Sequence, residues 1–245
     1  MFESKEKHEV PQTTFRTRQG DQWVELHSDA LFGGRTAVVF ALPGAYTPTC
    51  STTHLPRYEE LAPRLRAAGV DDIYCLSVND AFVMNAWGRD QGVSHVRLLP
   101  DGNGDFSQGM GMLIDKRDLG FGMRSWRYSM LVRDGVIEKM FIEPEQPGDP
   151  FEVSDADTML AYLDPAQANA PRIALFTRQG CGHCARAIGL LEERGLAYEE
   201  IPLGAGVTAH GLRAVSGRTT TPQVFIDGRH IGGADELTEY FGAKP

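Results

Sequence analysis

The sequence predicts an α/β protein made of two consecutive domains. Short apolar runs typical of buried strands alternate with segments in which apolar residues recur at helical spacing. This alternation stops at a small, polar, proline-bracketed segment, Asp164–Pro171, and begins again at Ile173. We therefore expect a first domain over residues 1–163, a linker over 164–171 and a second domain over 172–245.

Composition and charge limit the class of function. The chain has 245 residues and a formal net charge of −9, which argues against nucleic acid or a membrane surface as a partner, because phosphate binding needs clustered lysine and arginine. No apolar run approaches the roughly 18 residues of a membrane helix, and the N-terminus lacks the apolar stretch of a signal peptide. Four cysteines are too few for a disulfide scaffold, so we expect a cytoplasmic protein whose thiols are either reactive or inert.

The elements of the first domain follow from the pattern. Thr36–Leu42 is predicted as a buried strand that ends at the break Pro43-Gly44. The helical pattern after it has Tyr58, Leu61 and Leu65 on one face, and Pro56 either kinks this helix or marks its first turns. The remaining elements are a strand over 72–78, a helix over 81–90, a hairpin turning at Asp134-Gly135, and a helix to Leu163 opened by Ser154 with Asp157.

The second domain shows a complete order of elements. Ile173–Phe176 is predicted as a strand, and the helix after it has Cys184, Ile188 and Leu191 at i, i+4 and i+7. A strand over 198–203, a helix over 208–216, a hairpin through Asp227-Gly228 and a helix over 234–241 follow. The order β-α-β-α-β-β-α is the thioredoxin-type arrangement.

The pair Cys181-Gly-His-Cys184 at the start of a predicted helix has a redox mechanism. The first sulfur lies near unpaired N–H groups and the positive end of the helix dipole, which favours the thiolate. The second faces inward and can attack a mixed disulfide. A structural pair or half of a zinc site is the alternative, but no second Cys or His pair at zinc spacing occurs in this segment.

Three spaced motifs make the second domain closely resemble a bacterial glutaredoxin over nearly all of 172–245: Arg178-Gln-Gly-Cys181, Thr220–Asp227 and Ile231–Glu236. The resemblance implies that Cys181 attacks and that Cys184 is a dispensable partner. It also implies a glutathione site. In that site Arg178 would contact a carboxylate of glutathione, and Thr221, which precedes a cis Pro222, would pair its backbone with the cysteinyl part. Gly233, Ala234 and Asp235 would hold the γ-glutamyl end. The family commonly has Pro-Tyr between its cysteines, so Gly-His leaves the reduction potential open, and His183 could modulate Cys181.

The lone Cys50 stands in a different motif, Pro43-Gly-Ala-Tyr-Thr47-Pro-Thr-Cys50. On the first turn of a helix, Thr47 Oγ and Cys50 Sγ can face the same small space. Cleaving a peroxide needs a thiolate, a donor for the leaving oxygen and a cation for the developing charge. A helix N-terminus with an arginine would favour the thiolate of a residue that is otherwise largely protonated at neutral pH.

The pattern Pro-x-x-x-Thr-x-x-Cys resembles the peroxiredoxin active site, and two further segments, Leu76–Val83 and Trp126–Met130, resemble the type-5 branch over about residues 5–163. The resemblance implies a second thioredoxin-type fold. It also implies that Cys50 is the peroxidatic thiol, that Thr47 binds the peroxide oxygens, that Arg127 is the active-site guanidinium and that Pro43 shields the pocket. Many type-5 members carry a resolving cysteine near the segment that here is 147–152, and this sequence has none there.

Two other residues of the first domain have alternatives. Cys75 lies in the middle of a strand and is expected to be a buried core thiol, with an accessory redox role as the alternative. His54, one helical turn after Cys50, is expected on the surface or in ordinary packing, with a place in the Cys50 pocket as the alternative.

Some motifs have structural explanations. Asp101–Asp105 resembles the start of a calcium loop, but Phe106 and Met112 stand where that loop needs glycine and glutamate, so we expect a turn. The methionines at 110, 112 and 123 are expected to pack rather than to bind copper. Trp126 lines either the pocket or an interface.

Two thiol sites of different type on one chain suggest a relay. The sequence thus predicts a fused peroxiredoxin–glutaredoxin that reduces hydrogen peroxide and small alkyl hydroperoxides with glutathione as co-substrate and with no metal or organic cofactor. A peroxide-sensing disulfide reductase that acts on client proteins is the alternative. The expected partners are glutathione, hydroperoxides and further copies of the chain, as a dimer or tetramer.

Overall fold

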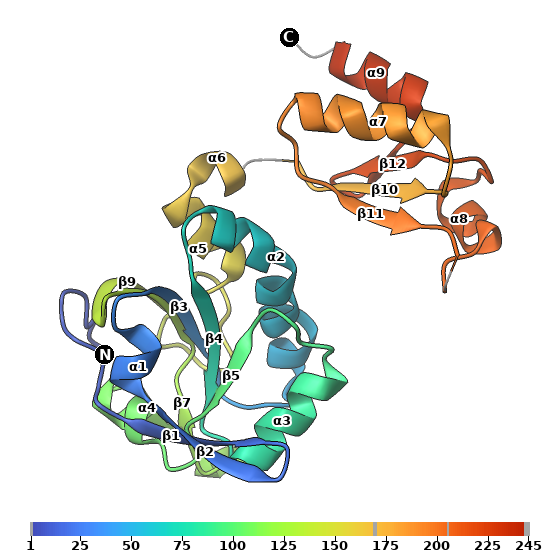
Figure 1. The fold of residues 1–245 in the computed structure, drawn as a ribbon. Helices are drawn as coiled ribbons and strands as arrows, with labels where there is room; N and C mark the ends of the chain where they lie inside the picture. Colours follow the sequence, from blue (N-terminus) through green and yellow to red (C-terminus); the bar gives the residue numbers. More distant parts are fainter. Residues whose placement is uncertain (1, 169–170, 205, 243–245) are drawn as a thin grey trace. The chain divides into compact units, whose positions relative to one another are not determined.

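The structure is a computed structural model that describes residues 2–168, 171–204 and 206–242. The chain divides into two compact units, residues 1–168 and 169–245. Each contains a mixed β-sheet with helices packed on it, and both are coloured along the chain in Figure 1.

The first unit contains a five-stranded sheet in the order β5-β4-β3-β8-β9. The three strands β3 (Thr36–Ala41), β4 (Asp72–Ser77) and β5 (Arg97–Pro100) are parallel. The hairpin of β8 (Tyr128–Arg133) and β9 (Val136–Ile142) adds to them antiparallel. Strand β3 is therefore central, and it is buried on both faces.

Side chains of β3 alternate between two apolar clusters. Ala37, Val39 and Ala41 point into one cluster, which α1 (Ser28–Phe32) and α4 (Asp105–Gly109) help to form. Val38 and Phe40 point into the other cluster, whose remaining members come mainly from α2 (Leu55–Ala67), α3 (Ala81–Asp90) and α5 (Ala156–Leu163). Two small hairpins complete the unit: β1 (Thr14–Gln19) with β2 (Gln22–His27), and β6 (Leu113–Asp115) with β7 (Met123–Ser125).

Most of the predicted elements of the first unit are confirmed. The helix over 81–90 has the predicted bounds, and the predicted hairpin turns at Asp134 and Gly135, which both have positive φ. Pro56 marks the first turn of α2 rather than a kink. The predicted cap of α5 is wrong: Asp155, not Ser154, accepts from the backbone N–H of Thr158, at 2.9 Å.

The calcium-like segment is a turn, as expected, because the Asp101 carboxylate accepts from the backbone N–H groups of Phe106 and Ser107 at the start of α4. Met110 and Met112 pack in the core as predicted, whereas Met123 is 43% exposed. Trp126 lies inside the unit, where its indole N–H donates to the Glu143 carbonyl and its ring stacks on Phe2.

The segment predicted as a linker contains a one-turn helix, α6 (Pro165–Ala168). Proline is favoured in the first turn of a helix because its missing N–H is not needed there, and the Asp164 carboxylate accepts from the backbone N–H of Ala166 at 3.0 Å. The part of the predicted linker at Asn169 and Ala170 lies outside the described residues.

The second unit has the predicted order of elements. Its sheet runs β11-β10-β12-β13, where β10 (Ile173–Thr177) is parallel to β11 (Glu199–Pro202) and antiparallel to β12 (Gln223–Ile226), and β13 is Arg229–Gly232. Figure 1 shows α7 (Gly182–Glu193) and α9 (Ala234–Gly242) side by side over this sheet, with α8 (Ala209–Ser216) apart from them. Apolar residues of α7, α9, β10 and β12 form its core.

Candidate active site

Cys50 lies where the central strand of the first unit gives way to a helix. After β3, the chain turns through Gly44 and Tyr46, and a helical turn starts at Pro48. The turn is fixed by two hydrogen bonds: Ala45 N–H donates to Asn79 Oδ1 at 3.0 Å, and the Thr47 hydroxyl donates to the Gly44 carbonyl at 2.8 Å. Residues Cys50–His54 form one turn of π-helix that continues into α2. The Cys50 side chain is completely buried.

Arg127 brings a positive charge to the Cys50 sulfur from the neighbouring strand. It directly precedes β8, which pairs with β3, and its Nη2 lies 3.5 Å from Cys50 Sγ. Burial acts to lower the pKa of Arg127, but Cys50 and the Asp149 carboxylate outweigh burial, and the pKa of Arg127 is raised above its ordinary value. Among the residues that the structure describes, the buried Nε of Arg127 has no hydrogen-bond partner.

His54 orients the guanidinium from the other side. Nη1 of Arg127 lies 3.0 Å from His54 Nδ1, and His54 Nε2 lies 3.2 Å from the Ser154 carbonyl oxygen. Burial, followed by the charge of Arg127, holds the pKa of His54 well below its ordinary value of 6.5. The expectation that His54 is a surface or ordinary packing residue is therefore wrong, and the alternative of a place in the Cys50 pocket holds.

Asp149 is a member of this cluster that the sequence did not reveal. Its carboxylate accepts from Nη2 of Arg127 at 2.5 and 2.6 Å, and this is the same nitrogen that contacts Cys50. The ring centroid of Phe151 lies 5.4 Å from Cζ of Arg127 and 4.8 Å from the ring centroid of His54. Both residues lie in the segment 147–152, which the sequence analysis considered only for a missing cysteine.

Glu143 holds the end of this segment in place. Its buried carboxylate accepts from the backbone N–H groups of Glu152, Val153 and Ser154 and from the Ser154 hydroxyl. Its own N–H donates to the Arg127 carbonyl at 3.1 Å. The loop is therefore fastened to the strand that carries Arg127.

Of the residues predicted for this site, the structure brings Cys50 and Arg127 together. Thr47 lies one turn before Cys50 with its hydroxyl bonded to Gly44, so a role on the substrate stays a prediction. Pro43 is half-buried just after β3, and its shielding role also stays a prediction. Cys75 is a core thiol as expected: burial, together with the charge of Cys50, raises the pKa of its thiol well above the ordinary value.

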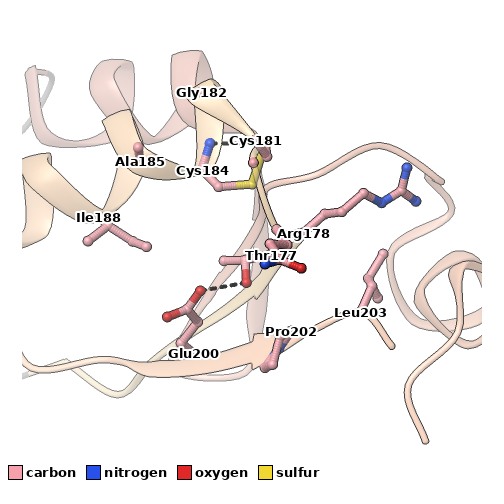
Figure 2. Close-up of a pocket in the computed structure, with 12 residues that line it drawn as sticks. Thr177, Arg178, Cys181, Gly182, Cys184, Ala185, Ile188, Glu200, Pro202 and Leu203 are labelled. Carbon is pink, nitrogen blue, oxygen red and sulfur yellow. Dashed lines mark hydrogen bonds between the residues drawn. A yellow bond between two sulfur atoms is a disulfide. The ribbon is translucent and has the colours of Figure 1, made fainter. Parts of the chain in front are cut away.

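The dithiol of the second unit lies beside a pocket of about 830 Å³. Cys181 immediately precedes α7 and is joined to Cys184 by a disulfide. Thr177, Arg178, Glu200 and Leu203 are among the residues that line the pocket, and Figure 2 shows the Arg178 side chain extended away from the disulfide. The pocket thus contains a cationic side chain that extends away from the disulfide (Figure 2).

The other predicted glutathione residues lie around the same helix. Thr221 contacts Cys181 and precedes Pro222 through a cis peptide bond, as predicted. Beyond β13, Ala234 is buried and the Gly233 N–H donates to Glu236. The Asp235 carboxylate pairs with Arg186 of α7 at 2.6 Å. His183 lies 3.4 Å from the same Arg186, so its predicted influence on Cys181 stays untested.

The described residues contain no group of three or more His, Cys, Asp or Glu side chains arranged to hold a metal ion. Within the same described ranges, no helix is long and apolar enough to cross a membrane.

Comparisons with known proteins agree with the two sites. One thioredoxin fold holds a buried cysteine beside a guanidinium, and the other holds a dithiol beside a pocket. Residues 5–160 match the Redoxin family model and residues 173–231 match the Glutaredoxin model. The chain therefore belongs to the Redoxin family and carries a glutaredoxin unit after its peroxiredoxin unit.

Individual relatives agree with both parts. The hybrid peroxiredoxin hyPrx5 of Haemophilus influenzae is 61% identical over 97% of this chain and 99% of its own length. A peroxiredoxin of Synechocystis is 59% identical over 65% of this chain and 91% of its own length. Among solved structures, reduced Prx3 of Vibrio vulnificus in complex with hydrogen peroxide is 41% identical, with a TM-score of 0.61, over 65% of this chain and 98% of that one. The chain is a peroxidase of the peroxiredoxin type with a fused glutaredoxin.

Proposed function

We propose that the protein reduces hydrogen peroxide and small alkyl hydroperoxides with glutathione, and that Cys50 is the peroxidatic thiol. The observation that carries the proposal is the 3.5 Å contact between Arg127 Nη2 and the buried Cys50 sulfur. A guanidinium at this distance favours the thiolate and can stabilise the charge that develops on a peroxide oxygen. The hydrogen peroxide complex of Vibrio vulnificus Prx3 supports the substrate class.

The chemistry of the first step follows from these groups. The Cys50 thiolate attacks one peroxide oxygen and the O–O bond breaks, which leaves Cys50 as the sulfenic acid, while the departing hydroxide or alkoxide takes a proton from solvent and leaves as water or an alcohol. Arg127 offers, besides the Nη2 that faces the sulfur, a buried Nε–H to which no described residue is bonded. Thr47 supplies a hydroxyl for the peroxide oxygens, and Pro43 shields the pocket.

The second half of the cycle uses an external thiol. The segment 147–152 holds no cysteine, and Cys75 is buried with a raised pKa, which makes it a poor nucleophile. Glutathione therefore condenses with the sulfenic acid to give a Cys50–glutathione disulfide and water. Cys181 takes the glutathionyl group and frees the Cys50 thiol, and a second glutathione then releases glutathione disulfide.

The glutaredoxin unit supplies the glutathione site for this transfer. Arg178 contacts a carboxylate, Thr221 and Pro222 contact the cysteinyl part, and Gly233, Ala234 and Asp235 hold the γ-glutamyl end. Cys184 is the second thiol of the pair. The cycle needs no metal and no organic cofactor, only glutathione as co-substrate.

We also infer that the chain forms a homo-oligomer, a dimer or tetramer, in the cytoplasm. The support for the oligomer is that large apolar side chains of the first unit, including Tyr46, Phe82 and Phe121, are between 41% and 59% exposed. The support for the compartment is the need for a reduced glutathione pool.

Steady-state peroxidase assays with glutathione or thioredoxin as reductant test the proposal. Turnover with glutathione should be lost in Cys50→Ser and in Cys181→Ser, while Cys184→Ser should keep much of it because glutathionyl transfer needs only the attacking thiol. Cys50→Ser should keep glutaredoxin activity on a small mixed disulfide. Absence of turnover with glutathione in the unmodified protein would favour a peroxide-sensing reductase of client proteins instead.

A further inference from the structure

In the disulfide-bonded form that the structure shows, polar groups of Cys184 and Thr221 lie within 3.7 Å of the Cys181 sulfur. The backbone N–H of Cys184 lies 3.2 Å from Sγ, as expected at the start of a helix. The side-chain hydroxyl of Thr221 lies 3.7 Å from the same sulfur, and the Thr221 carbonyl oxygen lies 3.5 Å from it. Thr221 is half-buried, so this contact is partly protected from water.

These groups have opposite effects on the two protonation states of the thiol. The N–H of Cys184 and the hydroxyl of Thr221 can donate to a thiolate and stabilise it. The carbonyl of Thr221 can only accept, so it favours the protonated thiol. If the hydroxyl were absent, one donor and one acceptor would face the sulfur; with it, two donors face one acceptor.

We propose that the Thr221 hydroxyl is a catalytic group of the glutaredoxin unit, where it donates a hydrogen bond to the Cys181 thiolate. This inference deepens the proposed function and rests on it for its role in the cycle. It assigns to the side chain of Thr221 a task separate from the backbone contact expected for glutathione. The hydrogen of a hydroxyl group can rotate, so it can point at the sulfur that lies 3.7 Å away.

The hydrogen bond acts in both halves of the transfer. In the first, the Cys181 thiolate attacks the glutathionyl sulfur of the mixed disulfide, the Cys181–glutathione bond forms, and the other thiol leaves as a thiolate. In the second, a glutathione thiolate attacks the glutathionyl sulfur, glutathione disulfide forms, and the Cys181 thiolate leaves. A donor to Cys181 raises the fraction of thiolate available for attack and makes Cys181 a better leaving group.

Charged groups near Cys181 make contacts of their own that do not involve Thr221. Arg178 and Glu200 line the same pocket, and Glu200 accepts from the Thr177 hydroxyl at 2.7 Å. On α7, His183 and Arg186 form a chain of contacts that leads to Asp235. A substitution confined to the Thr221 side chain therefore isolates the effect of its hydroxyl.

The test uses the full chain, reduced, with the rate of Cys181 alkylation by iodoacetamide followed by mass spectrometry as a function of pH. Thr221→Val replaces the hydroxyl by a methyl group of similar size, and should raise the midpoint of the rate profile by about one pH unit. Thr221→Ser keeps a hydroxyl and should stay close to the unmodified chain. Thr220→Val is the matched control, because the Thr220 hydroxyl accepts from Gln223 rather than contacting Cys181.

An unchanged midpoint in Thr221→Val would overturn the inference, as would an equal shift in Thr220→Val. If Thr221→Val does not fold, the pair Thr221→Ala and Thr221→Ser makes the same comparison, and equal midpoints in that pair would also overturn it. The alkylation profile needs no glutathione. A chain that failed to deglutathionylate a model disulfide would therefore contradict the proposed function and leave this measurement valid.

Discussion

In the peroxiredoxin unit, Arg127 fixes the tautomer of His54, and His54 in turn fixes the position of the Arg127 guanidinium. Arginine can only donate hydrogen bonds, so the Nη1 that lies 3.0 Å from His54 Nδ1 requires that nitrogen to be an unprotonated acceptor. The other ring nitrogen, Nε2, then carries the hydrogen and donates to the Ser154 carbonyl at 3.2 Å. A neutral imidazole in one tautomer therefore positions the guanidinium that faces Cys50.

Replacing His54 by leucine should slow the oxidation of Cys50 by about tenfold, because a buried charged donor that loses its acceptor costs on the order of 1–3 kcal/mol or leaves its position. His54→Asn places an amide oxygen close to the position of Nδ1 and should retain most of the rate. Stopped-flow measurement of the second-order rate with hydrogen peroxide distinguishes the two variants. Equal losses in both would mean that the ring matters only for packing against Phe40 and Phe151.

The depressed pKa of His54 predicts how stability depends on pH. Above pH 6.5 the residue is neutral in both the folded and the unfolded chain. As the pH falls below 6.5, the unfolded chain binds a proton that the folded chain excludes, so the free energy of unfolding decreases, by at most about 1.4 kcal/mol per pH unit for this one group. The loss continues until the pH reaches the lowered pKa of the folded state.

Chemical denaturation followed by tryptophan fluorescence measures this effect, because the three tryptophans, at positions 23, 87 and 126, all lie in the first unit. Between about pH 5 and 6.5, His54→Asn should show a shallower decrease in the free energy of unfolding than the unmodified chain. The exposed His8 supplies the control His8→Asn, whose slope should not change. Parallel slopes in all three proteins would contradict the assignment.

Asp149 competes with the Cys50 thiolate for the same nitrogen of Arg127. Asp149→Asn keeps an oxygen near Nη2 but removes the negative charge, so we expect Cys50 to react with peroxide about two- to fivefold faster near pH 6. The effect is small because Asp149 is 41% exposed and water screens its charge. Asp157→Asn is the control: that carboxylate pairs with Arg57 instead. A slower Asp149→Asn protein would show that Asp149 serves mainly to hold Arg127 in place.

Cys75→Ala should leave peroxidase turnover within about twofold of normal, because a buried, protonated thiol in the middle of β4 cannot attack readily. The lost packing should cost about 1 kcal/mol of stability. Mass spectrometry after one equivalent of peroxide tests this prediction. Detection of a Cys50–Cys75 disulfide would show that Cys75 has a redox role. The experiment is a real test of the prediction, because both thiols belong to the same buried cluster.

The parts of the fold with strong local patterns could be predicted from the sequence. The helix over 81–90 and the hairpin at Asp134-Gly135 depend on neighbouring residues, and both are found at their predicted positions. The β1–β2 hairpin was not predicted, because its strands lack a continuous apolar run and expose side chains such as Trp23. By contrast, the positions of Cys50 and Arg127 in the site could be inferred from sequence motifs.

His54 and Asp149 could not be placed in the same way, because their roles depend on contacts across 73 and 22 residues of sequence with Arg127. Their own neighbours in sequence resemble an ordinary helix turn and an ordinary proline-containing loop. The hydroxyl of Thr221 is a similar case, since its contact with Cys181 spans 40 residues. Such residues are recognised only when the fold has brought their partners together.

The carboxylate of Glu143 anchors one end of the loop that carries Asp149, and this anchoring leaves the rest of the loop open to change. One buried side chain fixes residues 152–154, while the chain from 144 to 150 runs mostly through exposed positions. Apart from Asp149, which contacts Arg127, and the buried Pro150, the positions of that stretch face solvent, and exposed loops of this kind tolerate insertion and substitution. Evolution or design could exchange the tip, adding a thiol or removing Asp149, and so retune how the oxidised cysteine is handled without rebuilding the sheet beneath it.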